Sequence, residues 1–413
     1  MQSFHHAAAA LDRDDPLAHC RARFSLPPGV VYLDGNSLGA LPRCVPERLR
    51  RAVELEWGGG LIRSWNDADW YPAPKRVAAK IAPLIGAAAD QVIAADSTTV
   101  NLFKVLTAAM EANPKRRIVL CERDNFPTDS YLAHEAAKRY GKTVRTVDQD
   151  TVEAAITEAG DALCAVTLTH VHYKTGRLHD LPRITALVQA QGGRIIWDLA
   201  HSAGAVPVAL DEAGADYAVG CGYKYLNGGP GAPAFAYVRR DHLAEFTTPL
   251  VGWHGHAAPF DFSPEWRAHP GIERLLVGTA PMLSMLALEA ALDAFDGVSM
   301  KALREKSLSL TRLFIAGYDA CLARHGLGLV TPREDAHRGS QVALTHPDGY
   351  AIMQAAIERG VIGDFRAPDI LRFGFAPLYV SHADVVRAVE TLDAILTEGL
   401  WREPRYAAKK AVT

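Results

Sequence analysis

The chain lacks the features that mark secreted, membrane-spanning or disulfide-stabilised proteins. Its six cysteines form no CxxC pair, and three of them lie in apolar stretches, which favours free thiols in a reducing compartment over a disulfide or zinc framework. No run of about 18 apolar residues is present, and the short apolar stretch near the N-terminus is followed by aspartates. We therefore expect a cytoplasmic protein without a membrane partner.

A surplus of basic charge is also missing. The 44 Lys and Arg residues are balanced by 47 Asp and Glu residues, so no basic field attracts nucleic acid. Neither a Gly-x-Gly-x-x-Gly segment opening a helix nor a P-loop occurs, which disfavours nucleotide binding. Two His-x-His pairs, 170/172 and 254/256, lack carboxylate or cysteine companions at metal-ligand spacing. We predict no nucleic-acid partner and no metal site.

The middle of the chain alternates short apolar runs with stretches of helical period, the pattern of a mostly parallel sheet covered by helices. Strands are predicted at residues 91–94, 117–121, 162–168, 194–197, 216–220 and 233–238. Helices are predicted at residues 102–111, 131–140, 151–159 and 183–191. The strands are apolar on both faces, which is typical of a sheet buried between two helix layers.

After about residue 280 the pattern changes. Long helical stretches at residues 281–295 and 300–325 precede shorter elements at residues 340–345, 351–358 and 370–373. The sequence thus predicts an α/β fold of two domains. A large domain spans residues 46–285, a small C-terminal domain spans residues 286–413, and an N-terminal segment, residues 1–45, packs with the small domain.

Two polar residues follow neighbouring apolar strands. Asp198 ends one, and Lys224 lies between the next strand and a Gly-Gly-Pro-Gly turn. Taken singly, Asp198 is compatible with a helix cap and Lys224 with an ordinary surface lysine. Because ligands bind beyond the carboxyl ends of such strands, the two together suit one aromatic ring held by its nitrogen and its aldehyde carbon. The pair predicts pyridoxal 5′-phosphate (PLP), with Lys224 forming the Schiff base.

Other residues fit the remaining parts of PLP. Hydroxyls and backbone N–H groups at the helix that begins near residue 98 would form an anion site, although plain capping by Asp96 or Ser97 explains the same pattern. Phe126 is placed to stack on the ring. Asp129 would hydrogen-bond near the ring oxygen or support Asp198.

With these residues identified, the sequence resembles the kynureninase family of fold-type I, aminotransferase-like PLP enzymes from about Tyr32 to Tyr379. The resemblance lies in residues 32–39, 97–102, 124–129, 197–204, 222–231, 252–256 and 371–379. Gly-Trp-His-Gly-His at 252–256 and Asn-Gly-Gly-Pro-Gly after Lys224 are its more specific parts. It implies a seven-stranded, mostly parallel sheet, a smaller α/β domain, and hydrolysis of L-kynurenine to anthranilate and L-alanine.

The resemblance also implies roles for individual residues. Catalysis would involve Lys224, Tyr223 and Asp198. Cofactor binding would involve Thr98, Thr99, Phe126, Asp129, Thr169, Asp198, His201, Tyr223, Lys224 and Trp253, with Thr279 supplied across a homodimer whose subunits share the site. Arg372 would bind the substrate α-carboxylate, and Asn36, Ser37 and Trp65 would lie near its aromatic end.

Three alternatives remain open from the sequence. The chain would otherwise be a PLP-dependent aminotransferase or a desulfurase-like relative. A desulfurase needs a reactive loop cysteine well after the lysine, and only Cys321, within a helical pattern, follows Cys221. The third alternative is a regulatory sensor built on a PLP domain. The sequence shows neither the DNA-binding module nor the basic arm that would support it.

Overall fold

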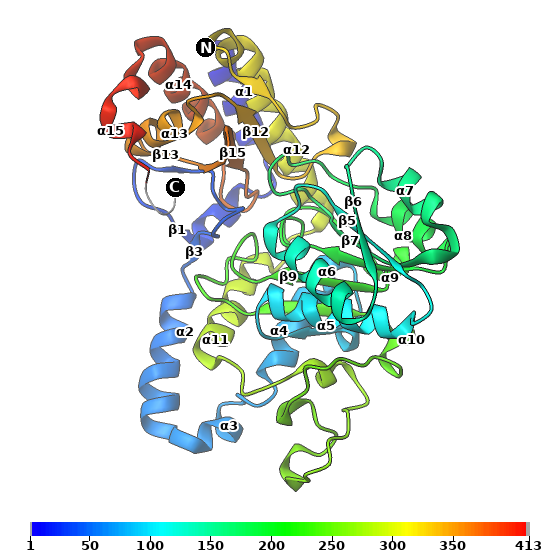
Figure 1. Cartoon of the computed structure of the whole chain (residues 1–413). Coiled ribbons are helices and arrows are strands. Elements are labelled where there is room, and N and C mark those ends of the chain that lie inside the picture. The colour runs from blue at the N-terminus through cyan, green and yellow to red at the C-terminus, as the bar shows by residue number, and fades with distance from the viewer. Residues whose placement is uncertain (1, 410–413) are drawn as a thin grey trace.

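The computed structural model describes residues 2–409 and is built around two sheets (Figure 1). The larger sheet has seven strands in the order β4-β10-β9-β8-β7-β5-β6. Their bounds are β4 Val92–Ala94, β5 Ile118–Glu122, β6 Thr143–Val147, β7 Leu163–Thr169, β8 Arg194–Asp198, β9 Tyr217–Cys221 and β10 Ala234–Val238. Only β10 runs antiparallel to its neighbours among the pairings of this sheet. The predicted α/β fold with a mostly parallel sheet is confirmed.

Alternate residues of these strands belong to two different hydrophobic clusters. In β8, Ile195 packs into the cluster that contains α4 and α8, whereas Ile196 packs into the cluster that contains α5. Successive strand side chains point to opposite faces, so strands that are apolar throughout bury both faces. The covering helices are α4 Ala73–Ile81, α5 Thr98–Ala112, α6 Pro127–Arg139, α7 Val152–Ala159 and α8 Leu181–Ala190.

The edge strand β6 was not among the predicted strands. Its sequence, Thr-Val-Arg-Thr-Val, alternates apolar and polar residues, and it pairs with β5 alone. Its one buried residue is Val147. An edge strand with so little buried apolar surface lacks the continuous apolar run by which the inner strands were recognised.

The smaller sheet is antiparallel, in the order β11-β12-β15-β14. Its strands are β11 Gly328–Leu329, β12 Gln341–Thr345, β14 Asp364–Arg366 and β15 Ile370–Gly374. The helices around it are α12 Met300–Gly317, α13 Gly349–Glu358 and α14 His382–Glu398. The start of α14 is fixed by a capping box between Ser381 and Asp384.

The N-terminal residues lie against this smaller sheet. Helix α1 Gln2–Arg13 contacts α14, and β2 Val31–Tyr32 pairs in parallel with β13 Val361–Ile362. A bridge from Asp34 to Gly374 continues this contact. Residues 34–39 are thereby held between the small sheet and the loop that carries Lys224, since the Gly39 N–H donates to the Tyr223 carbonyl at 2.8 Å.

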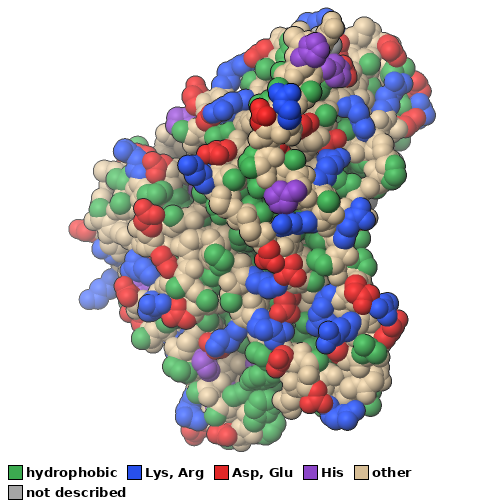
Figure 2. Space-filling view, turned by 180° about the vertical axis from the view of Figure 1, so that it is seen from behind, with side chains coloured by type: hydrophobic (Ala, Val, Ile, Leu, Met, Phe, Trp, Pro, Cys, Tyr) green, Lys and Arg blue, Asp and Glu red, His purple; other side chains and the backbone are tan. Residues whose placement is uncertain are grey.

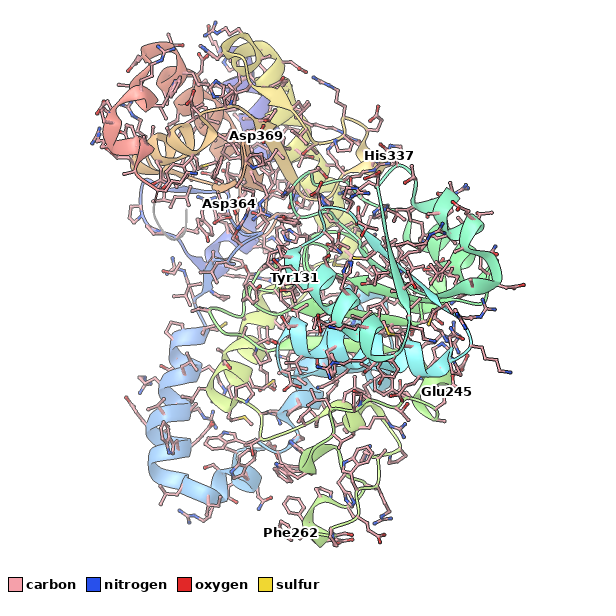
Figure 3. The ribbon with its side chains drawn as sticks, in the orientation of Figure 1. Tyr131, Glu245, Phe262, His337, Asp364 and Asp369 are labelled. Atoms are coloured by element: carbon pink, nitrogen blue, oxygen red, sulfur yellow. The ribbon has the colours of Figure 1, made fainter. Side chains whose placement is uncertain are left out.

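Two segments extend away from the sheets at the lower end of Figure 1. One is α2 Val45–Arg51 with its helical continuation Ala52–Gly60, which packs against α11 Met282–Ala291. The other is an irregular segment that spans residues 251–280 and carries Phe262 at its tip (Figure 3). No helix within residues 2–409 is long and apolar enough to cross a membrane.

Candidate active site

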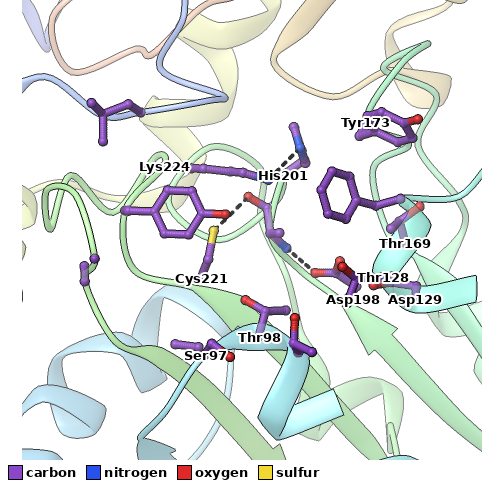
Figure 4. Close-up of a pocket in the computed structure, with 18 of the residues that line it drawn as sticks. Ser97, Thr98, Thr128, Asp129, Thr169, Tyr173, Asp198, His201, Cys221 and Lys224 are labelled. Carbon is purple, nitrogen blue, oxygen red and sulfur yellow. Dashed lines mark hydrogen bonds between the residues drawn. The ribbon is translucent and has the colours of Figure 1, made fainter. Parts of the chain in front are cut away.

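A cavity of about 450 Å³ lies at the carboxyl ends of β7, β8 and β9 (Figure 4). Asp198 and Thr169 end adjacent strands and are direct register partners, which places them side by side. Nine of the predicted site residues line this one cavity: Thr98, Thr99, Phe126, Asp129, Thr169, Asp198, His201, Tyr223 and Lys224. They come from five separate stretches of sequence.

One end of the cavity is acidic. Asp198 accepts a hydrogen bond from the Ala200 N–H at 2.7 Å, and Asp129 accepts one from Asn125 at 3.3 Å. Burial, followed by the charge of Asp198 and a hydrogen bond with it, raises the pKa of Asp129 well above its usual range. Burial also raises the pKa of Asp198, but the charge of Lys224, the Ala200 N–H and the hydrogen bond from Asp129 oppose that shift. The pair therefore holds a proton on Asp129 and leaves the negative charge on Asp198. A buried carboxylate in this state favours a cationic partner.

The other end of the cavity holds the amine of Lys224. Its Nζ lies 2.9 Å from Nε2 of His201, whose Nδ1 lies 3.1 Å from Oε1 of Gln341. The Gln341 amide nitrogen donates to the carbonyls of His172 and Tyr173, so its oxygen faces His201. Burial and then the charges of Lys224 and Arg372 hold the pKa of His201 well below its usual value. His201 is thus neutral, with Nδ1 as donor and Nε2 as acceptor for Lys224.

Phe126 forms an aromatic wall between these two ends. The Lys224 Nζ lies 5.9 Å from the centre of its ring, and Tyr173 packs edge-on against Phe126 at 5.5 Å. Helix α6 begins directly after Phe126, which keeps that ring at the edge of the sheet. A flat ring lying between Asp198 and Lys224 would stack on Phe126.

The N-terminus of α5 supplies the hydroxyl-rich side of the cavity. Ser97 caps the helix by accepting from the Val100 N–H, and Thr98 and Thr99 are the first helical residues. Free N–H groups and hydroxyls at a helix start form an anion site. Asp96, with a positive φ of 47°, turns the chain into this helix.

Lys104 supports that turn from inside the protein. Its side chain is fully buried and donates to Asp96 at 2.5 Å and to the Leu275 carbonyl at 2.6 Å. Burial lowers the pKa of Lys104, while the Asp96 carboxylate opposes that shift. Lys104 thereby joins the start of α5 to the segment that leads to Thr279.

Beyond Tyr173, a cluster of charged residues from the small sheet meets the N-terminal loop. Arg372 donates to Asp364 through Nε at 2.8 Å and Nη2 at 2.5 Å, and to the Tyr173 carbonyl through Nη1 at 2.6 Å. Ser37 donates to Asp364 at 2.8 Å and accepts from Arg372 at 2.9 Å. The predicted residues Ser37 and Arg372 are therefore in contact with each other and lie next to the cavity wall.

Besides Ser37 and Arg372, four predicted residues do not line the cavity of the single chain. Trp253 is 43% exposed and stacks on His254, and Thr279 is exposed. Trp65 packs edge-on against Trp70. Asn36 is fully buried against Gly374, and its side-chain nitrogen and oxygen have no hydrogen-bond partner among residues 2–409.

Several residues of the site were not predicted from the sequence. Tyr173 lines the cavity four residues after β7 ends, a position that a search beyond every strand end would have included. Gln341, Asp364 and Arg366 lie in or next to strands of the small sheet, and their place depends on how that sheet meets the large one. No local pattern in the sequence marks them.

The donor set matches the polar groups of PLP. Asp198 carries the negative charge that a protonated ring nitrogen needs, Lys224 provides an amine for the aldehyde, and the start of α5 provides an anion site for the phosphate. Phe126 offers the stacking face. Within residues 2–409 no group of three or more His, Cys, Asp or Glu side chains is placed to hold a metal ion.

Solved structures of the same fold include PLP enzymes. The chain is similar to C-DES in a lysine-to-alanine variant with glycine covalently linked to its PLP cofactor, with a TM-score of 0.79 and 18% identity over 90% of this chain and 98% of that one. It is also similar to the cysteine desulfurase CsdA of Escherichia coli, with a TM-score of 0.76 and 20% identity over 92% and 98%. At these identities the likeness establishes the fold alone.

Sequence relatives are much closer. Residues 303–392 match the family model of the kynureninase C-terminal domain. A kynureninase from Burkholderia mallei is 51% identical, with 98% of this chain and 99% of the relative aligned. A kynureninase from Deinococcus radiodurans is 53% identical over 94% of this chain and 95% of the relative. Because half of its residues are identical along nearly its whole length, the chain belongs to the kynureninase family of PLP-dependent enzymes.

Proposed function

We propose that this chain hydrolyses L-kynurenine to anthranilate and L-alanine in the cavity described above. The observation that carries the proposal is the placement of the Lys224 amine and the Asp129–Asp198 pair at opposite ends of one cavity. Arg372 and Ser37 lie beyond Tyr173, on the side from which an amino acid carboxylate would approach. Ser37, expected from the resemblance near the aromatic end of the substrate, is thus proposed to lie at its carboxylate end. The identity with curated kynureninases supports the same reaction.

Bound PLP supplies an aldehyde for the substrate amine and a protonated ring that accepts the electrons set free at the substrate carbons. Asp198 holds that ring nitrogen protonated, and Asp129 keeps the charge of Asp198 in place by donating to it. Lys224 takes the proton from the substrate Cα. Neutral His201 accepts a hydrogen bond from the Lys224 amine and so aims it into the cavity.

Tyr223 is proposed as the proton donor to the substrate. Burial raises its pKa above the usual tyrosine value, and the neighbouring Cys221 and the charge of Asp198 add to the shift. Tyr223 therefore keeps its phenolic proton at neutral pH and acts as a donor rather than a base. Tyr223 lines the same cavity as Lys224, whose Nζ lies 5.8 Å from the centre of the Tyr223 ring.

An aminotransferase is the competing function in the same fold. It needs a keto-acid acceptor in each cycle, whereas hydrolysis needs only water. We expect equal amounts of anthranilate and alanine from L-kynurenine with no keto acid added, measured by anthranilate fluorescence and amino acid analysis. Turnover that depends on added pyruvate or 2-oxoglutarate, with no alanine formed without it, would assign the chain to the aminotransferases.

We further propose that two chains form a homodimer with a shared active site. Apolar side chains are exposed on the two extended segments at the lower end of the molecule: Leu55, Trp57, Leu61, Ile62, Phe260 and Phe262. Figure 2 shows hydrophobic side chains at this end from behind. Large exposed apolar surfaces mark protein–protein contacts. Trp253 and Thr279 are exposed in the segment that carries Phe260 and Phe262, so the partner chain is in a position to use them.

The proposed division into domains places the substrate between two parts of the chain. PLP-binding residues belong to the large domain, residues 46–285. The Arg372 cluster combines the small domain, residues 286–413, with Ser37 of the N-terminal segment, residues 1–45. The two ends of an amino acid substrate would thus contact different domains.

A further inference from the structure

Arg366 lies on the same face of the small sheet as Asp364 and Arg372. In the β14–β15 pair, Asp364 is the direct register partner of Arg372. Arg366 is two residues further along β14 than Asp364, and strand residues two apart point to the same face. We propose that Arg366 binds the α-carboxylate of the substrate together with Arg372, an inference that rests on the proposed function.

Ser37 shows that an oxygen atom fits between the two guanidinium groups. Its Oγ accepts from Nη2 of Arg372 at 2.9 Å and from Nη2 of Arg366 at 3.3 Å. Guanidinium groups bind carboxylate oxygens through charge-assisted hydrogen bonds, so a point on which two of them converge is a position for such an oxygen. One oxygen of the substrate carboxylate would take such a position beside Ser37.

Arg366 has more free donor capacity than Arg372. In Arg372, Nε, Nη1 and Nη2 all donate to partners within the protein. In Arg366, Nη2 pairs with Asp364 at 2.5 Å, whereas the buried Nε has no hydrogen-bond partner among residues 2–409. A buried donor without a partner is costly, and an arriving carboxylate would satisfy it.

The charge of the cluster also favours an anion. Asp364 is ionised, because Arg372 and Arg366 overcome the effect of burial and keep its pKa below its usual value. Burial and the charge of Asp364 raise the pKa of Asp34 to about 7, so it is largely protonated in mildly acidic solution. Two guanidinium groups then face one carboxylate and leave one positive charge uncompensated. Arg366 supplies this excess, since Arg372 and Asp364 alone would be neutral.

The cluster faces the cavity and not the opposite side of the sheet. After burial and Lys224, the charges of Arg372 and Arg366 both contribute to lowering the pKa of His201. Arg372, the partner of Asp364, donates to the carbonyl of Tyr173, a residue that lines the cavity. The side chain of Arg366 is 37% exposed, which leaves it accessible to a substrate entering the cavity.

The test compares Arg366→Gln with Arg372→Gln and with Arg359→Gln, a control that removes an exposed arginine near the end of α13. L-Alanine and ethylamine, which lacks the carboxylate, are titrated against each holoenzyme, and binding is followed by the cofactor absorbance band. We expect Arg366→Gln to weaken L-alanine binding about 10- to 100-fold and to leave ethylamine binding within about threefold of the parent. KM for L-kynurenine should rise to a similar extent, with kcat changed much less.

Arg366→Lys keeps the charge and is expected to restore part of the L-alanine affinity, which a purely structural role would not produce. Equal losses for L-alanine and ethylamine, or unchanged L-alanine binding in Arg366→Gln, would overturn the inference while the hydrolysis of kynurenine by the parent stands. If the parent forms no anthranilate but Arg366→Gln still selectively loses L-alanine, the proposed function fails and the role of Arg366 remains.

Discussion

Pairs of interacting buried residues control the charge of this site. Asp198 keeps its negative charge because Asp129 holds the nearby proton, and His201 stays neutral because burial and the charge of Lys224 lower its pKa. Each of these states is set by a neighbour that lies far away in the sequence. The chemistry therefore depends on pairs of residues more than on individual ones.

We expect Asp198→Asn to reduce kcat by at least about 100-fold, because a neutral amide does not stabilise a protonated ring nitrogen. The substitution is nearly isosteric and removes one of two buried acids, so the thermal midpoint of the protein should fall little. Steady-state kinetics and thermal unfolding, measured on the same preparation, check both parts. Near-normal turnover would show that Asp198 does not contact the ring nitrogen.

Asp34 should give the enzyme a pH-dependent affinity for its substrate. Its pKa is raised to about 7, first by burial and then by Asp364. The charged and titratable groups around it are Asp364, Arg366, Arg372, Tyr32, Tyr225 and Tyr379. As pH rises through about 7, Asp34 ionises and cancels the excess positive charge of the cluster, so KM for L-kynurenine should rise.

Asp34→Asn removes this titration and is expected to give a flatter KM between about pH 6 and pH 8.

The raised pKa of Asp34 also affects the stability of the folded chain. The unfolded chain ionises Asp34 near pH 4 while the folded chain keeps it protonated, so this residue lowers stability progressively from about pH 4 to about pH 7. Asp34→Asn should therefore be more stable relative to the parent at pH 7 than at pH 4, as measured by urea unfolding.

At the scale of elements, the loop at residues 34–39 is held tightly against the turn that carries Lys224. A Cβ atom on Gly39 would lie 2.3 Å from the Lys224 carbonyl and 2.6 Å from Cα of Asn227. Backbone atoms have little room to move there, so the absence of a side chain is what allows this close approach. The loop brings Ser37 to the two arginines.

We expect Gly39→Ala to displace this loop and to lower kcat/KM for L-kynurenine by about 10-fold or more, since small misplacements of binding residues are costly. PLP binding should persist, because most PLP-binding residues lie in the large sheet and its loops. Absorbance of the bound cofactor and kinetics test the two statements. Gly29→Ala is a control outside the site: an added Cβ there meets nothing within 4 Å, although Gly29 has a positive φ of 76° that Gly39 does not share, so this control includes a backbone strain absent from Gly39→Ala.

The local sequence predicted the inner strands and the polar residues at their ends. Asp198 ends an apolar run and Lys224 lies three residues after the next one. A polar residue at or shortly after the end of an apolar run is a local signal, and the parallel sheet brings such positions to one edge. Gln341 and Arg366 gave no such signal. Their function depends on the register of β14 with β15 and on the contact between the two sheets, which short sequence patterns do not encode. The edge strand β6 was missed because it buries little.

At the scale of the whole molecule, the active unit is proposed to contain two chains. Lys224→Ala and Thr279→Arg chains should each be inactive alone, because one lacks the amine and the other blocks the partner's site. Mixed under conditions that allow subunit exchange, they form heterodimers in which one site has both Lys224 and Thr279 intact. We expect activity to reappear in the mixture, reaching at most about a quarter of the parent value, since random pairing restores one site in half of the dimers.

Activity of each variant alone at the parent level would exclude a shared site, as would a fully active monomer by analytical ultracentrifugation. Phe262→Asp offers a separate test. It places a charge at a fully accessible position, 82% exposed, on the tip of the extended segment. If that tip is buried between chains, the Phe262→Asp dimer should dissociate at a higher protein concentration than the parent dimer does.

Lys104 has a consequence that reaches beyond the site it supports. Its ammonium group joins Asp96, at the start of the helix that receives the phosphate, to the Leu275 carbonyl, on the way to Thr279. Ordering of the start of α5 therefore favours ordering of the segment that leads to Thr279, and the reverse also holds. Cofactor occupancy and subunit association are therefore expected to be thermodynamically linked, with each strengthening the other by the same factor. A cell short of vitamin B6 would then hold this enzyme partly as separate subunits, and renewed supply would reassemble it.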